Sequence, residues 1–451
     1  MSLYPFQQAA IDRLAQSTAP LPYLAFDMGL GKTRIALLAA RARKVKRLLV
    51  ICPAVGRLSW LSETKKVWPD GPPLVIVRSP RDVLRLKSEE CIGVVSYGLI
   101  SNSNGAYNMV AELSKLPAFD MTVLDEAHAL KNTAAIRTKG ILHHLRLAKV
   151  LGDVLPMSGT PAPNHAGELF PILRTVYPAA IKGKVGKTMS KEEFEDVFCD
   201  VKEKWFNGRA VRVIEGSKNL DDLRARLSPH MLRLRKQEAL PELPDMNFDL
   251  LPVEVDANIG KEFDDVMPGP DATEEEILKA LTPAGGAHIA RLRQALGLAK
   301  AKSAVEVIMD KLESCRRKMV VFAHHRSVLD ALEAGLAYYN PVRLDGSTPE
   351  TLRKYNILEF LNNPNKRVFI GQTTAAGTSI TLVRDGLDVS DVFFVEASTN
   401  PGDNNQAASR IHRIGQKNPV QVWFITAYDT FDERIQDLIQ RRTAEFHKLF
   451  S

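Results

Sequence analysis

The sequence predicts two α/β domains, each built on a parallel β-sheet, with mainly helical insertions between them. Short apolar runs alternate with longer helical patterns over residues 1–164, and the same alternation returns over 291–451. Near-continuous apolar strands separated by helices are typical of parallel sheets that helices cover on both faces. A length of 451 residues, 45% hydrophobic and 25% charged, suits a globular chain of several domains.

Each domain has its own expected strands. In the first domain they lie at 47–52, 74–77, 91–96, 121–124 and 154–157, and in the second at 318–322, 367–370, 391–395 and 421–425. Residues 165–290 break this rhythm. Amphipathic stretches at 191–205 and 220–235 predict helices there, and Pro- and Gly-rich segments predict a connector. A helix is expected again over 289–312, leading into the second sheet.

Composition excludes several classes of protein. No apolar run approaches the ~18 residues of a membrane-spanning helix, so we expect no membrane. The N-terminus has no basic stretch followed by an apolar one, so we expect no secretory signal. The four cysteines form no C-x-x-C pair, which favours reduced thiols over disulfides or a metal site. We therefore expect a cytoplasmic protein, of a bacterium or of a virus in its host.

The net charge of +7 permits a nucleic-acid partner, and the distribution of charge indicates which segments would contact it. Basic residues exceed acidic ones by 9 over 1–164, by 4 over 165–240 and by 4 over 291–451. Acidic residues exceed basic ones by 10 over 241–290. We predict that this acidic connector faces away from any nucleic acid and that the basic excess belongs to the two α/β domains.

The segment LAFDMGLGKT (24–33) has the character of a phosphate-binding loop. Gly29 and Gly31 allow a tight turn whose backbone N–H groups face phosphate oxygens, and a helical pattern follows directly. Lys32 would reach the β- and γ-phosphates of a nucleotide, and the Thr33 hydroxyl would hold Mg²⁺. Phe26 stands where the strict G-x-x-x-x-G-K-[ST] pattern has glycine, so a chance Gly-Lys-Thr turn is the alternative.

The segment LDEAHALKN (124–132) strengthens the nucleotide interpretation. Asp125 follows an apolar strand, at the edge where ligands of open α/β sheets bind. Asp125 would hold Mg²⁺, and Glu126 would orient and deprotonate a water that attacks the γ-phosphate of ATP. Taken alone, an Asp-Glu pair is usually two solvated acids; the buried strand and the phosphate loop favour the catalytic interpretation.

The segment QAASRIHRIGQ (406–416) places Arg410 and Arg413 three residues apart, so that both can lie on one face of a helix. An arginine from a second domain can stabilise the charge that builds up during phosphoryl transfer. A solvated basic helix is the alternative. The position of the segment after a strand of the second domain favours a role at the ATP site.

These motifs occur in the order found in helicase superfamily two, and the chain resembles the Swi/Snf family of ATP-driven translocases on double-stranded DNA. The resemblance covers nearly the whole chain, and HRIGQ (412–416) and DGST (345–348) are more specific than a phosphate loop alone. It is nearest to the annealing-helicase branch, on FAHHRSVLD (322–330) and LDGSTPETLR (344–353). Further matching segments are YPFQ (4–7), ICPAVGRLSW (51–60), VVSYGLI (94–100), MSGTPAPN (157–164), MLRLRKQEALPELP (231–244) and TTAAGTSITL (373–382).

The resemblance implies two tandem RecA-like, doubly wound domains that use ATP and Mg²⁺. For Gln7 it implies a contact with the adenine edge. It implies nucleotide-binding or catalytic roles for Gly29, Gly31, Lys32, Thr33, Asp125, Glu126, Gln406, Arg410 and Arg413, and coupling of nucleotide to DNA for His128, Ser158, Thr160 and Gly377. Phe26 and Ser409 depart from the family, which often has an acid at the first position and Asp at the second.

The implied partner is double-stranded or branched DNA, bound by a monomer without strong sequence preference and without a histone-reading module. Loops after strands supply candidate contacts to the sugar-phosphate backbone, because hydroxyl and basic groups suit phosphate. These candidates are Arg57, Ser96, Tyr97, His324, Arg326, Thr373 and Thr374, and for each an ordinary surface residue is the alternative. Trp60 is expected to pack in the core.

Two other functions stay open. A strand-separating helicase would be supported by a long β-hairpin wedge, for which the sequence offers no clear candidate. An ATP-gated DNA-binding scaffold would hydrolyse no ATP, and the intact Lys32, Glu126 and two arginines disfavour it.

Overall fold

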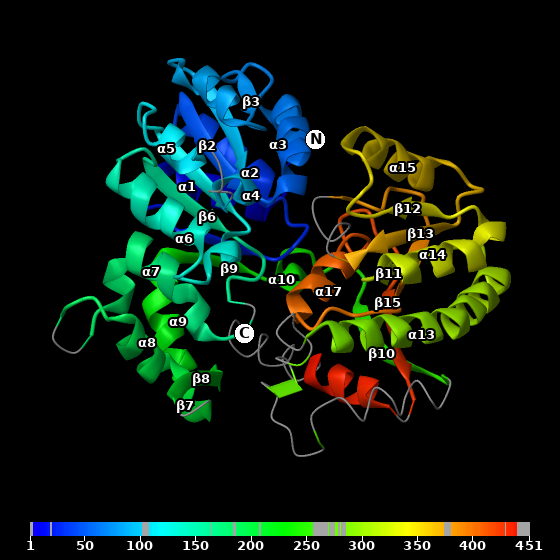
Figure 1. Cartoon of the computed structure of the whole chain (residues 1–451). Helices are drawn as coiled ribbons and strands as arrows, with labels where there is room; N and C mark the ends of the chain where they lie inside the picture. Colours follow the sequence, from blue (N-terminus) through cyan, green and yellow to red (C-terminus); the bar gives the residue numbers. More distant parts are fainter. Residues whose placement is uncertain are drawn as a thin grey trace. The chain divides into compact units, whose positions relative to one another are not determined.

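The computed structural model divides into two compact units, one within Met1–Ala239 and one within Leu240–Glu445 (Figure 1). It describes residues 3–18, 20–101, 108–162, 164–183, 186–206, 209–255, 269, 276–277, 280, 286–373, 380–428 and 430–439. Each unit contains its own parallel sheet, which confirms the predicted fold class. The unit boundary falls at residues 239 and 240, inside the region expected to hold insertions and connector.

The sheet of unit 1 has seven strands among the described residues, in the order β3-β4-β2-β5-β6-β1-β9, and all of its strand pairs are parallel. Its strands are β1 (Tyr23–Phe26), β2 (Arg47–Cys52), β3 (Leu74–Ile76), β4 (Cys91–Ser96), β5 (Met121–Asp125), β6 (Asp153–Met157) and β9 (Met231–Leu234). The central strands are fully buried, as their continuous apolar runs predict.

Unit 1 contains ten α-helices among the described residues. They are α1 (Pro5–Gln16), α2 (Lys32–Ala42), α3 (Arg57–Val67), α4 (Tyr97–Ser101), α5 (Met109–Leu113), α6 (Ile136–Lys139), α7 (Phe170–Val176), α8 (Lys191–Phe198), α9 (Leu220–Leu227) and α10 (Lys236–Ala239). Local sequence sets their starts: α1 begins with a proline, and Ser190 caps α8 by accepting a hydrogen bond from Glu193 N at 3.2 Å.

Two expected helices are shorter than predicted, because strands replace their second halves. The helix predicted over 191–205 ends at Phe198, where β7 (Cys199–Phe206) begins and pairs antiparallel with β8 (Arg209–Ser217). The helix predicted over 220–235 ends at Leu227, since Pro229 cannot continue it, and β9 follows beside β1. Strand pairing overrode the amphipathic pattern in both places, since β7 pairs with the adjacent β8 and β9 pairs with the distant β1. The expectation of no β-hairpin candidate was therefore wrong.

The sheet of unit 2 has six strands among the described residues, in the order β10-β15-β14-β11-β13-β12, again all parallel. Its strands are β10 (Met246–Val253), β11 (Lys318–Ala323), β12 (Val342–Leu344), β13 (Val368–Gln372), β14 (Val389–Phe394) and β15 (Val420–Ala427). Its helices are α13 (Gly286–Ser314), α14 (Arg326–Gly335), α15 (Glu350–Asn362) and α17 (Pro401–Ala408).

Alternate residues of β11 enter two separate cores. Val320 and Phe322 pack in a cluster that includes Phe360 of α15, whereas Met319 and Val321 pack in a cluster that includes Ile308 of α13. Side chains of a strand point alternately to the two faces of its sheet. Both faces of the second sheet are therefore covered by helices, as predicted.

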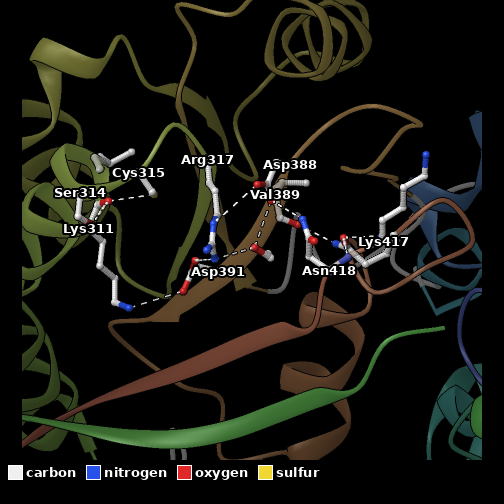
Figure 2. A network of polar contacts seen from close by, with 12 residues as sticks. Lys311, Ser314, Cys315, Arg317, Asp388, Val389, Asp391, Lys417 and Asn418 are labelled. Carbon is white, nitrogen blue, oxygen red and sulfur yellow. Dashed lines mark hydrogen bonds and ion pairs between the residues drawn. The ribbon is translucent and has the colours of Figure 1, made fainter.

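The amino edge of the second sheet carries a network of polar side chains (Figure 2). Arg317, just before β11, lies 3.7 Å (Nε to Oδ2) from Asp388, just before β14, and 3.6 Å (Nη1 to Oδ2) from Asp391. Asp391 also accepts a hydrogen bond from Trp423 Nε1 at 3.0 Å, and its Oδ1 lies 3.7 Å from Lys311 Nζ. Gln416, the last residue of the arginine motif, reaches the same edge, where its Nε2 donates to Val389 O at 2.7 Å.

The cysteines and helices add two facts. All four cysteines are free thiols, three of them buried. Among the described helices, none is both long and apolar enough to cross a membrane.

Candidate nucleotide-binding site

The phosphate loop runs from the end of β1 to the start of α2. Gly29 and Gly31 have φ angles of 87° and 83°, in the left-handed region that favours glycine. A Cβ atom on Gly31 would lie 2.6 Å from Gln7 Nε2, so the end of the Gln7 side chain would have to move. The loop thus delivers the N-terminus of α2, with its backbone N–H groups, beside Lys32 and Thr33.

Lys32 is buried with its ammonium group inside this loop. Its Nζ donates to Phe26 O at 2.8 Å and to Asp27 O at 3.3 Å. A Cβ atom on Gly159 would lie 3.4 Å from the same Nζ, so the loop after β6 packs closely against the lysine. An ammonium group held in this way is a fixed positive charge beside the helix N-terminus, the arrangement that favours a phosphate.

The two carboxylates lie where β5 ends. Asp125 is buried, and its Oδ2 accepts a hydrogen bond from Trp60 Nε1 at 2.9 Å. Burial and the neighbouring Glu126 raise the pKa of Asp125 to about 7, although Trp60 and Lys32 act in the opposite direction. Such a carboxylate is costly to ionise unless a cation lies beside it. Trp60 is in the core, as expected, but its link to Asp125 was not anticipated.

Glu126 is held in a left-handed conformation (φ 52°) and contacts the segment after β6. Ser158 Oγ donates to Glu126 Oε2 at 3.2 Å and accepts from Thr160 N at 3.0 Å. His128 Nδ1 lies 2.8 Å from Ser158 Oγ, which has a single proton, so the network assigns the donor role to His128 Nδ1. The structure thus brings together Glu126 with three predicted coupling residues, His128, Ser158 and Thr160.

Two tyrosines lie beside these carboxylates: Tyr23, which was not predicted as a site residue, and Tyr97, which was predicted as a DNA contact. Burial raises the pKa of Tyr23 and of Tyr97, and the nearest carboxylate charges, Glu126 for Tyr23 and Asp125 for Tyr97, raise it further. Both phenols therefore stay neutral beside the carboxylates. An apolar β-type run is the usual environment of such residues, so no sequence signal distinguishes them from core tyrosines.

Gln7 connects α1 to the phosphate loop. It is 3% exposed; its Oε1 accepts from Tyr4 N at 3.2 Å, and its Nε2 donates to Leu30 O at 3.2 Å. An amide side chain has two lone pairs and two protons, so one of each is left for a base edge. Phe26, the departure from the expected pattern, packs against Phe6 with ring centroids 6.2 Å apart.

The arginine motif of unit 2 does not lie on a helix, and that expectation was wrong. Helix α17 ends at Ala408, and Arg410 and Arg413 lie in the turns that follow. Arg410 Nη1 donates to Ile380 O at 3.4 Å. Arg413 Nε donates to Ser409 O at 2.9 Å and Nη1 donates to Thr381 Oγ1 at 2.7 Å; burial lowers the pKa of Arg413 to about 10. Gln406 lies half-buried on α17, and Gly377 is outside the described residues.

The predicted DNA contacts divide into exposed and buried side chains. His324, directly after β11, and Arg326, the first residue of α14, are exposed, and Arg57 at the start of α3 is partly exposed. Ser96, Tyr97 and Thr373 are at most 4% exposed. The expectation that these three lie in accessible loops was wrong, since strand β4 runs directly into α4 and Thr373 Oγ1 donates to Ala323 O at 3.3 Å. Thr374 is outside the described residues.

The donor set of unit 1 fits a magnesium nucleotide. Mg²⁺ prefers oxygen ligands and usually takes one or two from protein, with water and substrate phosphates completing its shell. Thr33 and the buried Asp125 offer such oxygens, while Lys32 and the glycine loop offer charge and N–H groups for phosphate. The described residues contain no cluster of three or more His, Cys, Asp or Glu side chains that could hold a metal ion.

Comparisons with known proteins identify the family. Residues 20–301 match the model of the SNF2-related domain, and residues 299–415 match the helicase conserved C-terminal domain. The DNA annealing helicase and endonuclease ZRANB3 of Bos taurus is 27% identical over 98% of this chain and 40% of its own length. The SWI/SNF-related matrix-associated actin-dependent regulator of chromatin subfamily A-like protein 1 of Bos taurus is 32% identical over 98% of this chain and 44% of its own length.

The chain spans about two fifths of the length of these curated relatives. The solved Sulfolobus solfataricus SWI2/SNF2 ATPase core in complex with dsDNA matches at 20% identity and a TM-score of 0.44, covering 100% of this chain and 93% of that one. The resemblance to the annealing-helicase branch is confirmed by the curated relatives. The chain belongs to the SNF2-related family and carries both of its helicase-superfamily ATPase domains.

Proposed function

We propose that this protein hydrolyses ATP in response to double-stranded or branched DNA and uses the energy to translocate on it without strong sequence preference. One observation carries the proposal: a glycine loop with Lys32 and Thr33 and a carboxylate pair tied into the Ser158 network belong to one compact unit. A DNA-binding scaffold has no need of these catalytic groups.

In this proposal each group has one task. Lys32 and the backbone N–H groups of the loop would bind the β- and γ-phosphates, and Thr33 and Asp125 would hold Mg²⁺, which would neutralise charge on those phosphates. Glu126 accepts a proton from water as the water oxygen bonds to the γ-phosphorus and the bond to the β–γ bridging oxygen breaks, giving ADP and phosphate. Ser158 keeps the Glu126 carboxylate oriented through the 3.2 Å hydrogen bond.

Unit 2 contributes positive charge and DNA contacts. Arg410 and Arg413 would stabilise charge on the transferred group, with Gln406 nearby on the nucleotide side. Exposed His324 and Arg326 would contact the sugar-phosphate backbone together with Arg57 of unit 1. Glu396 fixes that loop of unit 2, since its Oε2 accepts from His324 N at 2.9 Å and from His325 N at 2.8 Å.

The test is ATP turnover with no DNA, single-stranded DNA and duplex DNA, followed by triplex displacement. We expect duplex DNA to stimulate turnover most, and displacement to require ATP and to fail in Glu126→Gln. Equal turnover under all three conditions would refute DNA dependence. Displacement by Glu126→Gln at the wild-type rate would favour a scaffold. Increasing salt should weaken DNA binding steeply, because the contacts are to phosphates.

Strand separation is a second candidate, favoured by the β7–β8 hairpin. Its strands pair along their whole length, from Cys199 with Ser217 to Phe206 with Arg209. A hairpin of this kind can act as a wedge at a fork. Replacing residues 201–214 by a short Gly-Ser turn should leave duplex-stimulated ATP turnover unchanged, and loss of fork unwinding by this variant alone would establish the wedge.

A further inference from the structure

The segment that leaves unit 1 is fixed to the phosphate loop. Strand β9 pairs with β1 as far as Phe26 and Leu234, and Asp27 N then donates to Leu234 O at 3.1 Å. The Asp27 carboxylate pairs with Arg233 Nη1 at 2.8 Å and accepts from Lys236 N at 2.9 Å. Asp27 thus binds the start of the phosphate loop to residues just before the boundary of the unit.

The segment that enters unit 2 is fixed to the arginine motif. His412 lies between Arg410 and Arg413 in sequence, is 7% exposed, and has its Nε2 2.7 Å from Pro244 O. A carbonyl oxygen only accepts hydrogen bonds, so His412 Nε2 carries the proton and donates. Directly after Pro244, Val420 N donates to Asp245 O at 2.8 Å, and β10 continues alongside β15.

Few residues separate the segment held by Asp27 from the segment held by His412. Only residues 237–243 lie between Lys236 and Pro244, and part of them is taken up by α10 and by a turn in which Leu243 N donates to Leu240 O at 2.9 Å. Leu240 is buried, so the middle of the segment is itself packed. A long, solvated linker would absorb a displacement at either end, whereas a short, ordered one transmits it.

We propose that residues 234–244 form a strap that couples the phosphate loop to the arginine motif, with Asp27 and His412 as its positioning residues. Because both anchors lie in ATP motifs, a movement of the phosphate loop pulls on the segment that carries Arg410 and Arg413. The strap rests on the proposed ATPase function and adds to it the physical connection between its two halves.

Lengthening the strap is the most direct test. A Gly-Ser insertion between the exposed Pro241 and Glu242 adds up to ~7 Å of reach and leaves both anchors in place. The matched control is the same insertion between the exposed Pro364 and Asn365, before β13. His412→Ala removes the exit anchor, and His412→Gln restores a donor that can reach Pro244 O. Each variant is measured for kcat and KM of ATP at saturating duplex DNA.

We expect the strap insertion and His412→Ala to lower kcat ~10-fold with KM changed less than ~2-fold, because binding groups are untouched while the transition state loses its arginines. His412→Gln should recover most of kcat, and the control insertion should stay within ~2-fold of wild type. If the strap insertion changes kcat no more than the control insertion does, the proposed coupling through residues 234–244 is overturned. If duplex DNA does not stimulate even the wild type, the proposed function fails, and the strap is judged by the same ratios in turnover without DNA.

Discussion

The two units hold their functional side chains in different ways. In unit 1 the groups hold one another: Trp60 donates to Asp125, and Ser158 donates to Glu126. In unit 2 the acceptors of Arg413 are neutral, a backbone carbonyl and a hydroxyl, and burial alone lowers its pKa. A carboxylate partner would neutralise the arginine, so neutral acceptors fix its position while keeping its charge available for phosphate. We infer from this difference that unit 1 binds and orients the nucleotide, and that unit 2 supplies positive charge for its phosphates.

The largest expected effect separates binding from turnover. Arg413→Ala should lower kcat ~10³-fold with ATP affinity changed less than ~3-fold, because its charge acts on the transition state. Lys32→Ala should abolish measurable nucleotide binding. Turnover and the binding of a fluorescent ATP analogue are measured in parallel. Loss of nucleotide affinity in both variants would contradict the inference that unit 1 binds the nucleotide and unit 2 supplies charge to the transition state.

A smaller effect is expected at Trp60, which donates a hydrogen bond to Asp125, the proposed Mg²⁺ ligand. Trp60→Phe keeps most of the ring volume but removes the donor to Asp125 Oδ2, and it should raise the Mg²⁺ concentration needed for half-maximal turnover ~10- to 100-fold. Trp68→Phe, just after α3 and also buried, is the matched control and should change this value less than ~2-fold. Identical Mg²⁺ titrations would show that Trp60 only fills space.

Within unit 2, the amino edge should affect stability and not catalysis. Asp391→Asn removes the charge that Lys311 faces and one of the two carboxylates that Arg317 faces, and it should lower the free energy of unfolding by about 3 kcal/mol. ATP turnover below the transition should be unchanged. Asp385→Asn removes an exposed ion pair with Lys417 and should leave the denaturant unfolding curve almost unchanged. Reduced turnover of Asp391→Asn would contradict the prediction that this polar network affects the stability of unit 2 and not catalysis.

The smallest effect concerns acid stability at the end of β12. Burial by itself would raise the pKa of Asp345, but hydrogen bonds from Ser347 and Arg343 outweigh it and lower the pKa from 3.8 to about 2. A pKa lowered by folding contributes stability above the unfolded-state value, and the contribution is lost as pH falls through the folded-state value. Asp345→Asn should therefore be less stable by about 2 kcal/mol above pH ~5. The difference in free energy of unfolding between wild type and Asp345→Asn should disappear as pH falls from ~4 toward ~2. A difference that is independent of pH would disprove the lowered pKa of Asp345.

The regular parts of the chain could be predicted because local sequence decides them. Strands β2 and β4 match the predicted ranges 47–52 and 91–96, since continuous apolar runs have one favourable location in an α/β domain. Of the two helices that were predicted too long, one ends in a local hairpin, and the other is followed by a strand that pairs with distant residues. Met231–Leu234 becomes a strand because Tyr23–Phe26 offers an open edge, and no pattern within 220–235 carries that information.

The candidate site follows the same division. Residue type and order alone pointed to Lys32, Thr33, Asp125, Glu126 and the two arginines, because phosphate and Mg²⁺ chemistry requires those groups near strand ends. The sequence by itself also determined two parallel-sheet units and membership of an ATPase family. Only the tertiary structure decided which side chains support the site: Trp60 on Asp125, Ser158 on Glu126, Asp27 on β9 and His412 on Pro244. Each of these contacts joins segments far apart in the chain, and hydrogen bonds depend on distance in space, which residue order does not contain.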